Sequence, residues 1–189
     1  MITGPFYGEQ MIRRILLPLC LVLLPVLVFA KEPIRILTGS VVKVADGDTI
    51  TVNSEGTKLK VRLYGIDAPE SEKINKRTGK VSKQGQPYGE EAFQALSGKV
   101  MGKQVRLEVM AIDRYKRAVS IVYLGETNVN QGMVSAGWAW AYRQYLDRPH
   151  ASVYLEAEEA ARSARRGLWK DRNPQPPWEF RREQRGRGF

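Results

Sequence analysis

The sequence contains almost no cysteine and almost no histidine. Among its 189 residues, Cys20 is the single cysteine and His150 the single histidine. One cysteine cannot form a disulfide within the chain, and a cysteine-rich metal site is excluded as well. One histidine leaves no room for a zinc site built from several histidines. A bound metal ion would therefore need oxygen ligands, which are typical of calcium and magnesium.

Acidic residues are scarce relative to basic ones. The chain has 20 Asp and Glu against 30 Lys and Arg, which gives a formal net charge of +10. This excess favours nucleic acid or another anionic surface as a partner, although a soluble basic protein without such a partner would show the same balance. The length and the hydrophobic content of 43% indicate one globular domain with extensions.

A long unbroken apolar run is also lacking. The most apolar stretch, residues 15–30, follows Arg13-Arg14 and is interrupted by two prolines. It is short for a membrane span, which needs about 20 apolar residues, and its order of features is typical of a secretory signal. We predict that residues 1–30 are an N-terminal extension and signal peptide, with the start at Met11, cleavage after Ala30, and a secreted or periplasmic product. The alternative is an uncleaved membrane anchor.

Beyond this stretch, alternating apolar and polar residues predict five short strands. They lie near residues 36–44, 49–52, 58–63, 103–110 and 119–123. Helical spacing follows in residues 87–100, 128–136 and 151–168. We therefore predict that residues 31–170 form an α+β domain dominated by a five-stranded β-barrel, an OB-fold with about three helices. Other small α+β folds share this count of strands.

Two segments lack the apolar residues that a packed element needs. Residues 71–86 carry five basic residues and are predicted to be a mobile basic loop. Residues 171–189 are rich in proline, arginine and glycine and are predicted to be a disordered basic tail. Such a tail either adds attraction to nucleic acid or is a solvated segment with no role.

The residues that follow two of the predicted strands have the chemistry of phosphodiester hydrolysis. This reaction needs a cation, a base that takes a proton from water, and positive charge at the transition state. Asp48 and Asp67 are oxygen ligands nineteen residues apart, and Glu70 is a candidate general base. Arg62 and Arg117 are candidates to bind phosphate oxygens. Taken singly, each has an ordinary alternative as a turn former or a surface charge.

The turn beside Asp48 contains two further residues of interest. Asp46 is predicted to hold the turn rather than to bind a metal ion, because aspartate next to glycine is a common turn former. Gly47 is predicted to let the chain reverse direction between the two strands.

In combination, these residues resemble one family. The motifs are Asp-Gly-Asp-Thr at residues 46–49, Arg-Leu-x-x-Ile-Asp-x-Pro-Glu at 62–70, and Asp-x-Tyr-x-Arg at 113–117. The sequence from residue 36 to 169 resembles the thermonuclease (staphylococcal-nuclease-like) family. The resemblance implies an OB-fold and a calcium-dependent endonuclease of DNA and RNA with little sequence preference, which leaves 3′-phosphate ends.

The resemblance also implies roles for individual residues. Arg62, Glu70 and Arg117 match the catalytic positions of the family. The calcium positions are matched by Asp48, Asp67 and the carbonyl of Ala68. Lys116 stands where the family has glycine, and lysine has less freedom of φ in the turn that carries Arg117.

Aromatic and basic residues extend the implied site toward the substrate. Tyr115 and Tyr142 match positions near the bound nucleotide, and Arg114 is a candidate phosphate contact. The expected partners are DNA and RNA, with single-stranded or frayed ends preferred; no protein partner is implied, and a monomer is expected. The alternative function is that of a non-catalytic OB-fold protein that binds nucleic acid through charge and stacking.

Overall fold

The computed structural model describes residue 1, residue 4 and residues 32–147 and 150–186. The predicted signal peptide lies, apart from residues 1 and 4, outside the described residues, so its start, its cleavage site and the resulting location stay predictions. Among the helices that the structure does describe, none has both the length and the apolar character needed to cross a bilayer.

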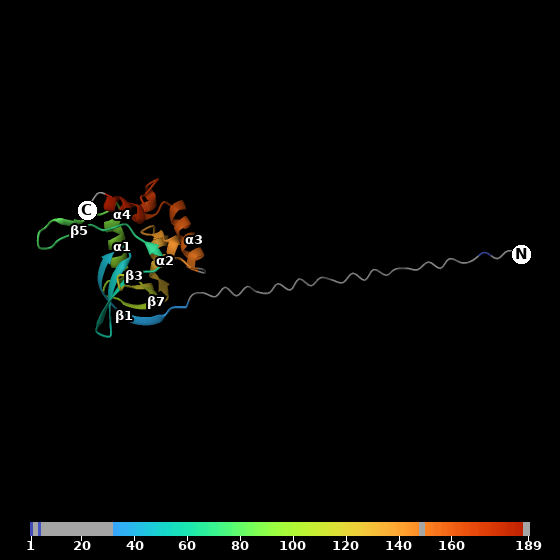
Figure 1. Cartoon of the computed structure of the whole chain (residues 1–189), viewed down its shortest axis with the longest axis horizontal. Coiled ribbons are helices and arrows are strands. Elements are labelled where there is room, and N and C mark those ends of the chain that lie inside the picture. The colour runs from blue at the N-terminus through green and yellow to red at the C-terminus, as the bar shows by residue number, and fades with distance from the viewer. Residues whose placement is uncertain (2–3, 5–31, 148–149, 187–189) are drawn as a thin grey trace.

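Five strands form a closed barrel (Figure 1). They are β1 (Arg35–Asp46), β2 (Thr49–Ser54), β3 (Thr57–Leu63), β7 (Gln104–Ile112) and β8 (Ala118–Leu124). Antiparallel pairing joins them in the order β3-β2-β1-β7-β8, and a parallel pairing of β3 with β8 closes the ring. This confirms the predicted α+β fold with a five-stranded barrel, and its topology is that of an OB-fold.

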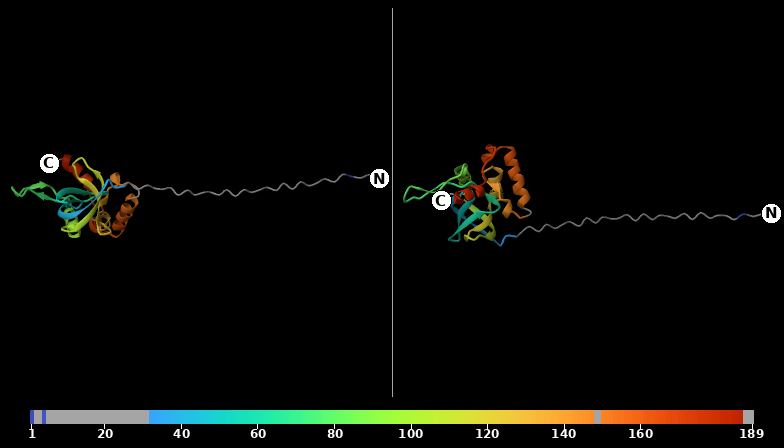
Figure 2. Two further views of the ribbon diagram at one scale, coloured as in Figure 1. Left: turned by 90° about the horizontal axis from the view of Figure 1, so that it is seen from below. Right: turned by 45° about the horizontal axis from the view of Figure 1, so that its top comes forward.

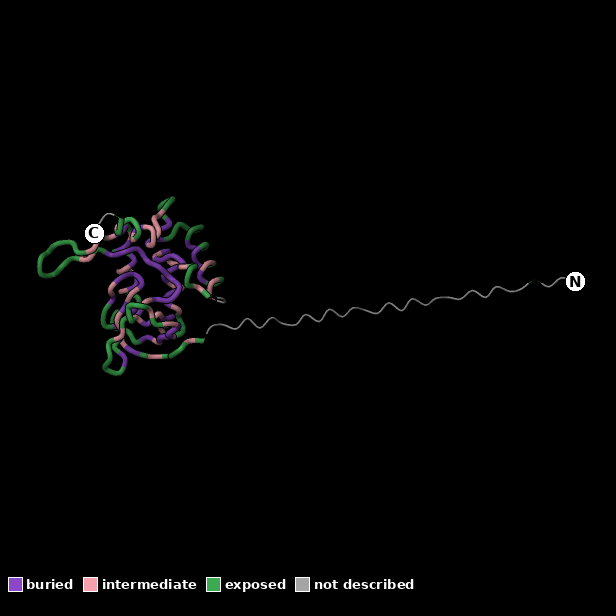
Figure 3. The backbone as a smooth tube through the Cα atoms, in the orientation of Figure 1, coloured by how far each residue is buried: buried purple, intermediate pink, exposed green. Residues whose placement is uncertain are grey.

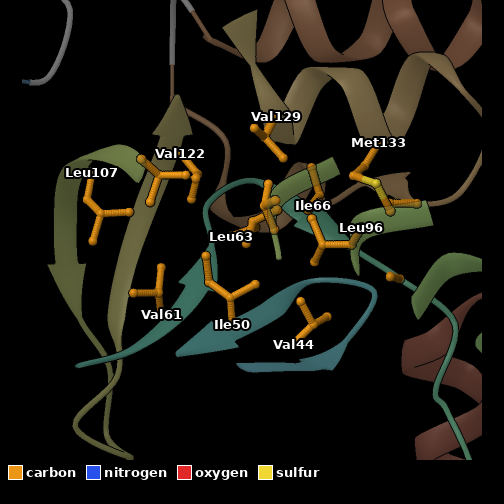
Figure 4. Packing of buried hydrophobic residues seen from close by; sticks show 14 of the residues in the cluster. Val44, Ile50, Val61, Leu63, Ile66, Leu96, Leu107, Val122, Val129 and Met133 are labelled. Carbon is orange, nitrogen blue, oxygen red and sulfur yellow. The ribbon is translucent and has the colours of Figure 1, made fainter. Parts of the chain in front are cut away.

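Alternation along the strands fills the barrel with apolar side chains. Ile50, Val61, Leu63 and Leu107 point into one buried cluster (Figure 4). Their polar neighbours along each strand point outward, because successive side chains of a strand face opposite sides. A barrel of this size has an interior that side chains can fill completely, so its binding chemistry lies at the rim rather than in a channel.

Three helices cover the barrel. They are α1 (Gly89–Val100), α2 (Val129–Ser135) and α3 (His150–Ser163). Leu96 of α1 and Met133 of α2 join the barrel cluster, and α2 packs between α3 and β8 (Figure 4). The shorter elements are β4 (Ile66–Asp67), β9 (Thr127–Asn128), β10 (Trp140–Ala141), η1 (Arg143–Tyr145) and η2 (Gly167–Lys170).

The basic segment at residues 71–86 contains a two-stranded hairpin, whereas its composition predicts an irregular loop. Strands β5 (Lys73–Ile74) and β6 (Val81–Lys83) pair with each other and project from the barrel on the side opposite α3 (Figures 1 and 2). The Asn75 side chain shapes the tip by accepting a hydrogen bond of 2.9 Å from the backbone N–H of Arg77. Nearly all of the hairpin is exposed (Figure 3).

The prediction of a disordered tail over residues 171–189 is wrong for most of that segment. Residues 177–186 form helix α4 (Pro177–Gly186), whereas 187–189 lie outside the described residues. Phe180 is buried, and Trp178 packs edge-on against Trp140 at a ring-centroid distance of 6.3 Å. Two aromatic residues thus dock a helix that its average composition did not predict.

Candidate active site

Two buried aspartates form ion pairs with the same arginine at the rim of the barrel. Asp48 lies in the β1–β2 turn, and Arg62 lies opposite Thr49 in the β2–β3 pairing. The Arg62 guanidinium donates one N–H to Asp48 Oδ1 and another to Asp67 Oδ1, the second at 2.6 Å. The structure therefore brings together the three residues that the motif separates by up to nineteen positions.

Both aspartates are removed from solvent. Asp48 is 2% exposed and Asp67 is fully buried. Asp48 also accepts hydrogen bonds of 2.9 Å from the Thr49 hydroxyl and from the backbone N–H of Ala68. Burial raises the pKa of Asp48 to about 6; the Arg62 guanidinium opposes this shift, and the negative charges of Asp67 and Asp46 add to it. The site thus holds more negative charge than Arg62 alone balances.

This donor set fits a hard divalent cation. Oxygens of Asp48 and Asp67 converge on a positively charged group, and the carbonyl of Ala68 follows Asp67 directly in the chain. Within the described ranges, no group of three or more His, Cys, Asp or Glu side chains is placed to hold a metal ion. Calcium accepts such a sparse set because it also takes backbone carbonyls and water as ligands.

Gly47 is needed for space as well as for turning the chain. A Cβ at this position would lie 2.8 Å from the Cβ atoms of both Ala68 and Ala92. As predicted, Gly47 lies in the turn between the antiparallel strands β1 and β2, although its φ is not positive. The glycine lets the β1–β2 turn, the segment after β4 and helix α1 approach each other closely, which brings Asp48 within reach of the Ala68 N–H.

Glu70 is held between two cations. The side chain is largely buried, with Oε1 accepting a hydrogen bond of 2.8 Å from Arg181 and Oε2 accepting one from Lys83. Burial alone would raise the pKa of Glu70, but the hydrogen bonds from Lys83 and Arg181 outweigh it and hold the pKa below its usual value. Glu70 is therefore an ionised carboxylate at neutral pH, as a general base must be.

Helix α1 fixes the backbone of Glu70 through another close approach. A Cβ on Gly89 would lie 2.1 Å from the carbonyl oxygen of Glu70. This oxygen is a backbone atom, so moving it would displace the chain around Glu70. We expect Gly89→Ala to lower the free energy of unfolding by about 1–3 kcal/mol, the usual cost of overpacking. Denaturant unfolding with a parallel cleavage assay measures both this loss and the displacement of Glu70.

Gly98 of the same helix is the matched control for that substitution. Nothing lies within 4 Å of a Cβ built there. Gly98→Ala is expected to raise the free energy of unfolding by about 0.5–1 kcal/mol, because alanine is the better helix former. Equal effects at the two positions would show that the contact with Glu70 has no structural importance.

Asp46 does more than hold its turn. Its Oδ1 accepts hydrogen bonds from the backbone N–H and the hydroxyl of Ser71, at 3.1 and 2.9 Å, and its Oδ2 pairs with Lys73 at 3.2 Å. Asp46 thus ties the β1–β2 turn to the residue that follows Glu70 and to the base of the hairpin. The sequence motif places this acid correctly but does not reveal its partner.

Arg117 lies at the neighbouring β7–β8 turn. Its Nε donates to Asp113 Oδ2 at 2.7 Å, and within the described residues its ion pair is with Asp113 rather than with Asp48, Asp67 or Glu70. The parallel pairing of Ala118 with Val61 places the start of β8 beside β3, the strand that carries Arg62. The structure therefore brings Arg117 to the same rim but not into the carboxylate cluster.

Lys116 adopts the left-handed conformation that the family's glycine would favour. Its φ is 59°, a region that costs a non-glycine residue roughly 1–2 kcal/mol. We expect Lys116→Gly to raise the free energy of unfolding by about 1 kcal/mol, and Lys116→Ala, which keeps a Cβ, to give no such gain. Thermal and denaturant unfolding of the two variants compare the effects. A gain from alanine equal to that from glycine would show that the lysine side chain, not the backbone, is unfavourable.

The candidate nucleotide-contacting residues fall into two groups. Tyr115 is 63% exposed, and the guanidinium groups of Arg114 and Arg117 lie 4.9 and 5.5 Å from its ring centroid. Tyr142 lies beside the cluster, where its backbone N–H donates to the carbonyl of Gly65 at 2.8 Å, next to β4. The first group belongs to the β7–β8 turn and the second to the segment that follows β10.

One face of Tyr142 is already covered. Trp178 of α4 stacks on it with a centroid distance of 5.5 Å and an interplanar angle of 12°. The two rings, together with Trp140 and Arg143, line a cavity of about 480 Å³.

Arg181 of α4 is the site residue that sequence reasoning missed. Its guanidinium donates to both oxygens of Asp67, at 3.1 and 2.7 Å, as well as to Glu70. The available signal was the spacing of Trp178 and Arg181, which places the two side chains one helical turn apart on the same face. The proline-rich segment before them and the high content of arginine masked that pattern.

The barrel and its acidic rim define a small OB-fold protein with a carboxylate–arginine site, and comparisons with known proteins identify its family. The family described as staphylococcal nuclease homologue matches residues 60–171. An uncharacterized endonuclease of Haemophilus influenzae is 41% identical over 149 residues, which cover 78% of this chain and 75% of that protein. The chain belongs to the staphylococcal nuclease homologue family.

Two further relatives are similar over most of their length. A micrococcal nuclease of Shigella flexneri is 40% identical over 153 residues, which cover 76% of this chain and 80% of that protein. Protein ParB of Escherichia coli is 38% identical over 173 residues, which cover 87% of this chain and 90% of that protein. The predicted resemblance is thus confirmed, while the family match ends at residue 171, before α4 begins.

Proposed function

We propose that the protein is a secreted, calcium-dependent endonuclease that hydrolyses DNA and RNA with little sequence preference and leaves 3′-phosphate ends. The observation that carries this proposal is the contact network of Asp48, Arg62, Asp67 and Glu70 on the rim of the barrel. Family membership and relatives named as nucleases and endonucleases support the hydrolytic activity. The N-terminal sequence supports secretion.

The network provides the parts that phosphodiester hydrolysis requires. A calcium ion held by Asp48, Asp67 and the Ala68 carbonyl would supply positive charge to a phosphate oxygen. Glu70 takes the proton of the attacking water, whose oxygen bonds to phosphorus as the bond to the 5′ oxygen breaks. Arg62 offers a planar pair of donors to the non-bridging oxygens. Arg117, which directly precedes β8, is the second candidate to bind the same phosphate.

Product analysis tests this chemistry. Single-stranded DNA and RNA oligonucleotides are incubated with the protein and calcium, and the new ends are identified by mass spectrometry. We expect 3′-phosphate and 5′-hydroxyl ends from both substrates. Products with 5′-phosphate and 3′-hydroxyl ends would show that the opposite bond breaks and would overturn the proposed mechanism.

The projecting hairpin is expected to bind the phosphates that flank the cut. Lys76, Arg77 and Lys80 lie exposed on it, and its base meets Glu70 through Lys83. Replacing these three exposed residues by alanine should weaken the binding of single-stranded DNA. It should also reduce the slope of log affinity against log salt concentration, by roughly 0.7 for each phosphate that the hairpin no longer binds. Binding is measured by fluorescence anisotropy with chelator present, so that the DNA stays intact.

A charge-conserving variant provides the control for the hairpin. Lys76→Arg combined with Lys80→Arg keeps the cations and should keep both the affinity and the salt slope. An unchanged slope in the alanine variant would show that the hairpin does not touch the bound strand.

A further inference from the structure

Helix α4 places a cation and an aromatic ring where the proposed substrate and metal would bind. Arg181 donates to both oxygens of Asp67 and to Glu70, and Trp178 stacks on Tyr142. We propose that α4 is a built-in competitive inhibitor, whose docked state blocks the site and whose displacement by calcium and nucleic acid opens it. This inference rests on the proposed function for what binds there.

The contacts of Arg181 are incompatible with a metal ion at the same place. Asp67 Oδ1 accepts hydrogen bonds from Arg62 and Arg181, and Oδ2 accepts one from Arg181 at 2.7 Å. A cation that takes Asp67 as a ligand must approach these same oxygens. The guanidinium occupies that position with a positive charge of its own, so it competes with the metal ion both for space and for charge.

The same guanidinium disables the candidate base. With Arg181 on Oε1 and Lys83 on Oε2, both carboxylate oxygens of Glu70 are engaged by cations. A water that is to be activated by Glu70 must approach one of these oxygens, and the Arg181 guanidinium stands 2.8 Å from Oε1. Glu70 is therefore best suited to accept a proton from water after Arg181 has left it.

Trp178 also blocks the site, at the position where a nucleobase would bind. It lies nearly parallel to Tyr142 at 5.5 Å, which is the geometry that a nucleobase stacked on the tyrosine would take. Because Trp178 and Arg181 are one turn apart on one helix, a single displacement of α4 removes both. Arg181 and Trp178 therefore occupy the positions that a metal ion and a nucleobase would take.

The docking of α4 is weak enough to be reversed. The helix has ten residues, which is too short to be stable alone in water, and only Pro177 and Phe180 are buried in it. Its other contacts include the ion pairs with Asp67 and Glu70, the stacking of Trp178 on Tyr142 and the edge-on contact of Trp178 with Trp140. Ligands that take those partners would therefore release the helix, and by linkage the docked helix weakens those ligands by the same factor.

Calcium binding without nucleic acid tests the competition directly. Calcium is titrated into the wild-type protein and into Arg181→Ala by isothermal titration calorimetry. If the docked state is about nine-tenths populated, the variant should bind calcium about tenfold more tightly. Arg182→Ala is the control, because it removes the same charge from an exposed position next along the helix and should bind as the wild type does. Unchanged or weaker binding by Arg181→Ala would overturn the proposal.

Hydrogen exchange of the wild-type protein tests the displacement without any substitution. Amide exchange in residues 177–186 should become faster when calcium is added, while exchange in the barrel strands stays the same or slows. Protection of 177–186 that stays constant in saturating calcium would overturn the displacement. Cleavage assays of the wild-type protein and Arg181→Ala separate the two proposals. Tighter calcium binding by Arg181→Ala without any cleavage would contradict only the proposed nuclease activity. Cleavage without tighter calcium binding by Arg181→Ala would contradict only the proposed inhibition by α4.

Discussion

Glu70→Gln is expected to slow cleavage of single-stranded DNA by at least about 10²-fold, because the amide cannot take a proton from water. The substitution keeps the shape of the side chain and removes only its charge. Since the proposed calcium positions are Asp48, Asp67 and the Ala68 carbonyl, the loss should appear in kcat. Calcium should bind at least as tightly as in the wild type, because the variant also loses the ion pair of Glu70 with Arg181. Initial rates in saturating calcium, with unfolding curves alongside, measure the effect.

Glu72→Gln is the matched control for this substitution. Glu72 lies two residues further along the same segment and is exposed. Its replacement removes the same charge without touching the cluster, so cleavage should continue at the wild-type rate. A near-normal rate for Glu70→Gln would show that the water is activated by another group and would remove Glu70 from the mechanism.

Arg62→Lys is expected to cost about 10²–10³-fold in kcat, the usual effect of losing a donor aimed at transition-state charge. Lysine keeps the charge but cannot bridge Asp48 and Asp67 as the planar guanidinium does. The two aspartates would lose their common partner, and the phosphate would lose a bidentate contact. Steady-state kinetics separate this loss in kcat from any change in KM.

Arg106→Lys is the control for replacing a barrel-strand arginine by lysine outside the carboxylate cluster. Arg106 also lies on a barrel strand and pairs with a carboxylate, that of Glu108, while stacking over Tyr123 at 4.1 Å. It is not part of the carboxylate cluster, so its replacement should leave kcat unchanged. If Arg62→Lys were as active as Arg106→Lys, the fork geometry of Arg62 would have no catalytic importance.

The barrel was predictable because strand alternation is a local property. Leu59, Val61 and Leu63 alternate with Lys58, Lys60 and Arg62, and this pattern alone defines the inner face of β3. The motif then identified Asp48, Arg62 and Asp67, which the closed barrel brings together. Local signals were sufficient here because the site is built at the ends of regular strands.

Contacts between distant segments were not predictable in the same way. Gly47 is needed because Ala68 and Ala92 crowd it, and Asp46 binds Ser71, 25 residues away. No local pattern reveals such partners, since they depend on how the elements pack. The place of Gly47 in the β1–β2 turn was predictable from the sequence, whereas its crowding by these two alanines was not.

The C-terminal segment shows the limit of composition as a guide. Averaged over 171–189, proline and arginine predict disorder. Contacts of Trp178, Phe180 and Arg181 nevertheless dock ten residues as a helix. The residue that matters most there, Arg181, contacts Asp67 across 114 positions of sequence. Only the folded structure places it in the site.

Cleavage of one single-stranded DNA oligonucleotide in calcium, compared with the same reaction in chelator, tests the central claim most directly. Binding of the oligonucleotide is measured in parallel by anisotropy with the same protein. The proposed nuclease predicts cleavage in calcium, and in chelator no cleavage but binding of the intact oligonucleotide. DNA that stays intact in saturating calcium while still bound by the protein would contradict it and would favour the non-catalytic OB-fold protein instead.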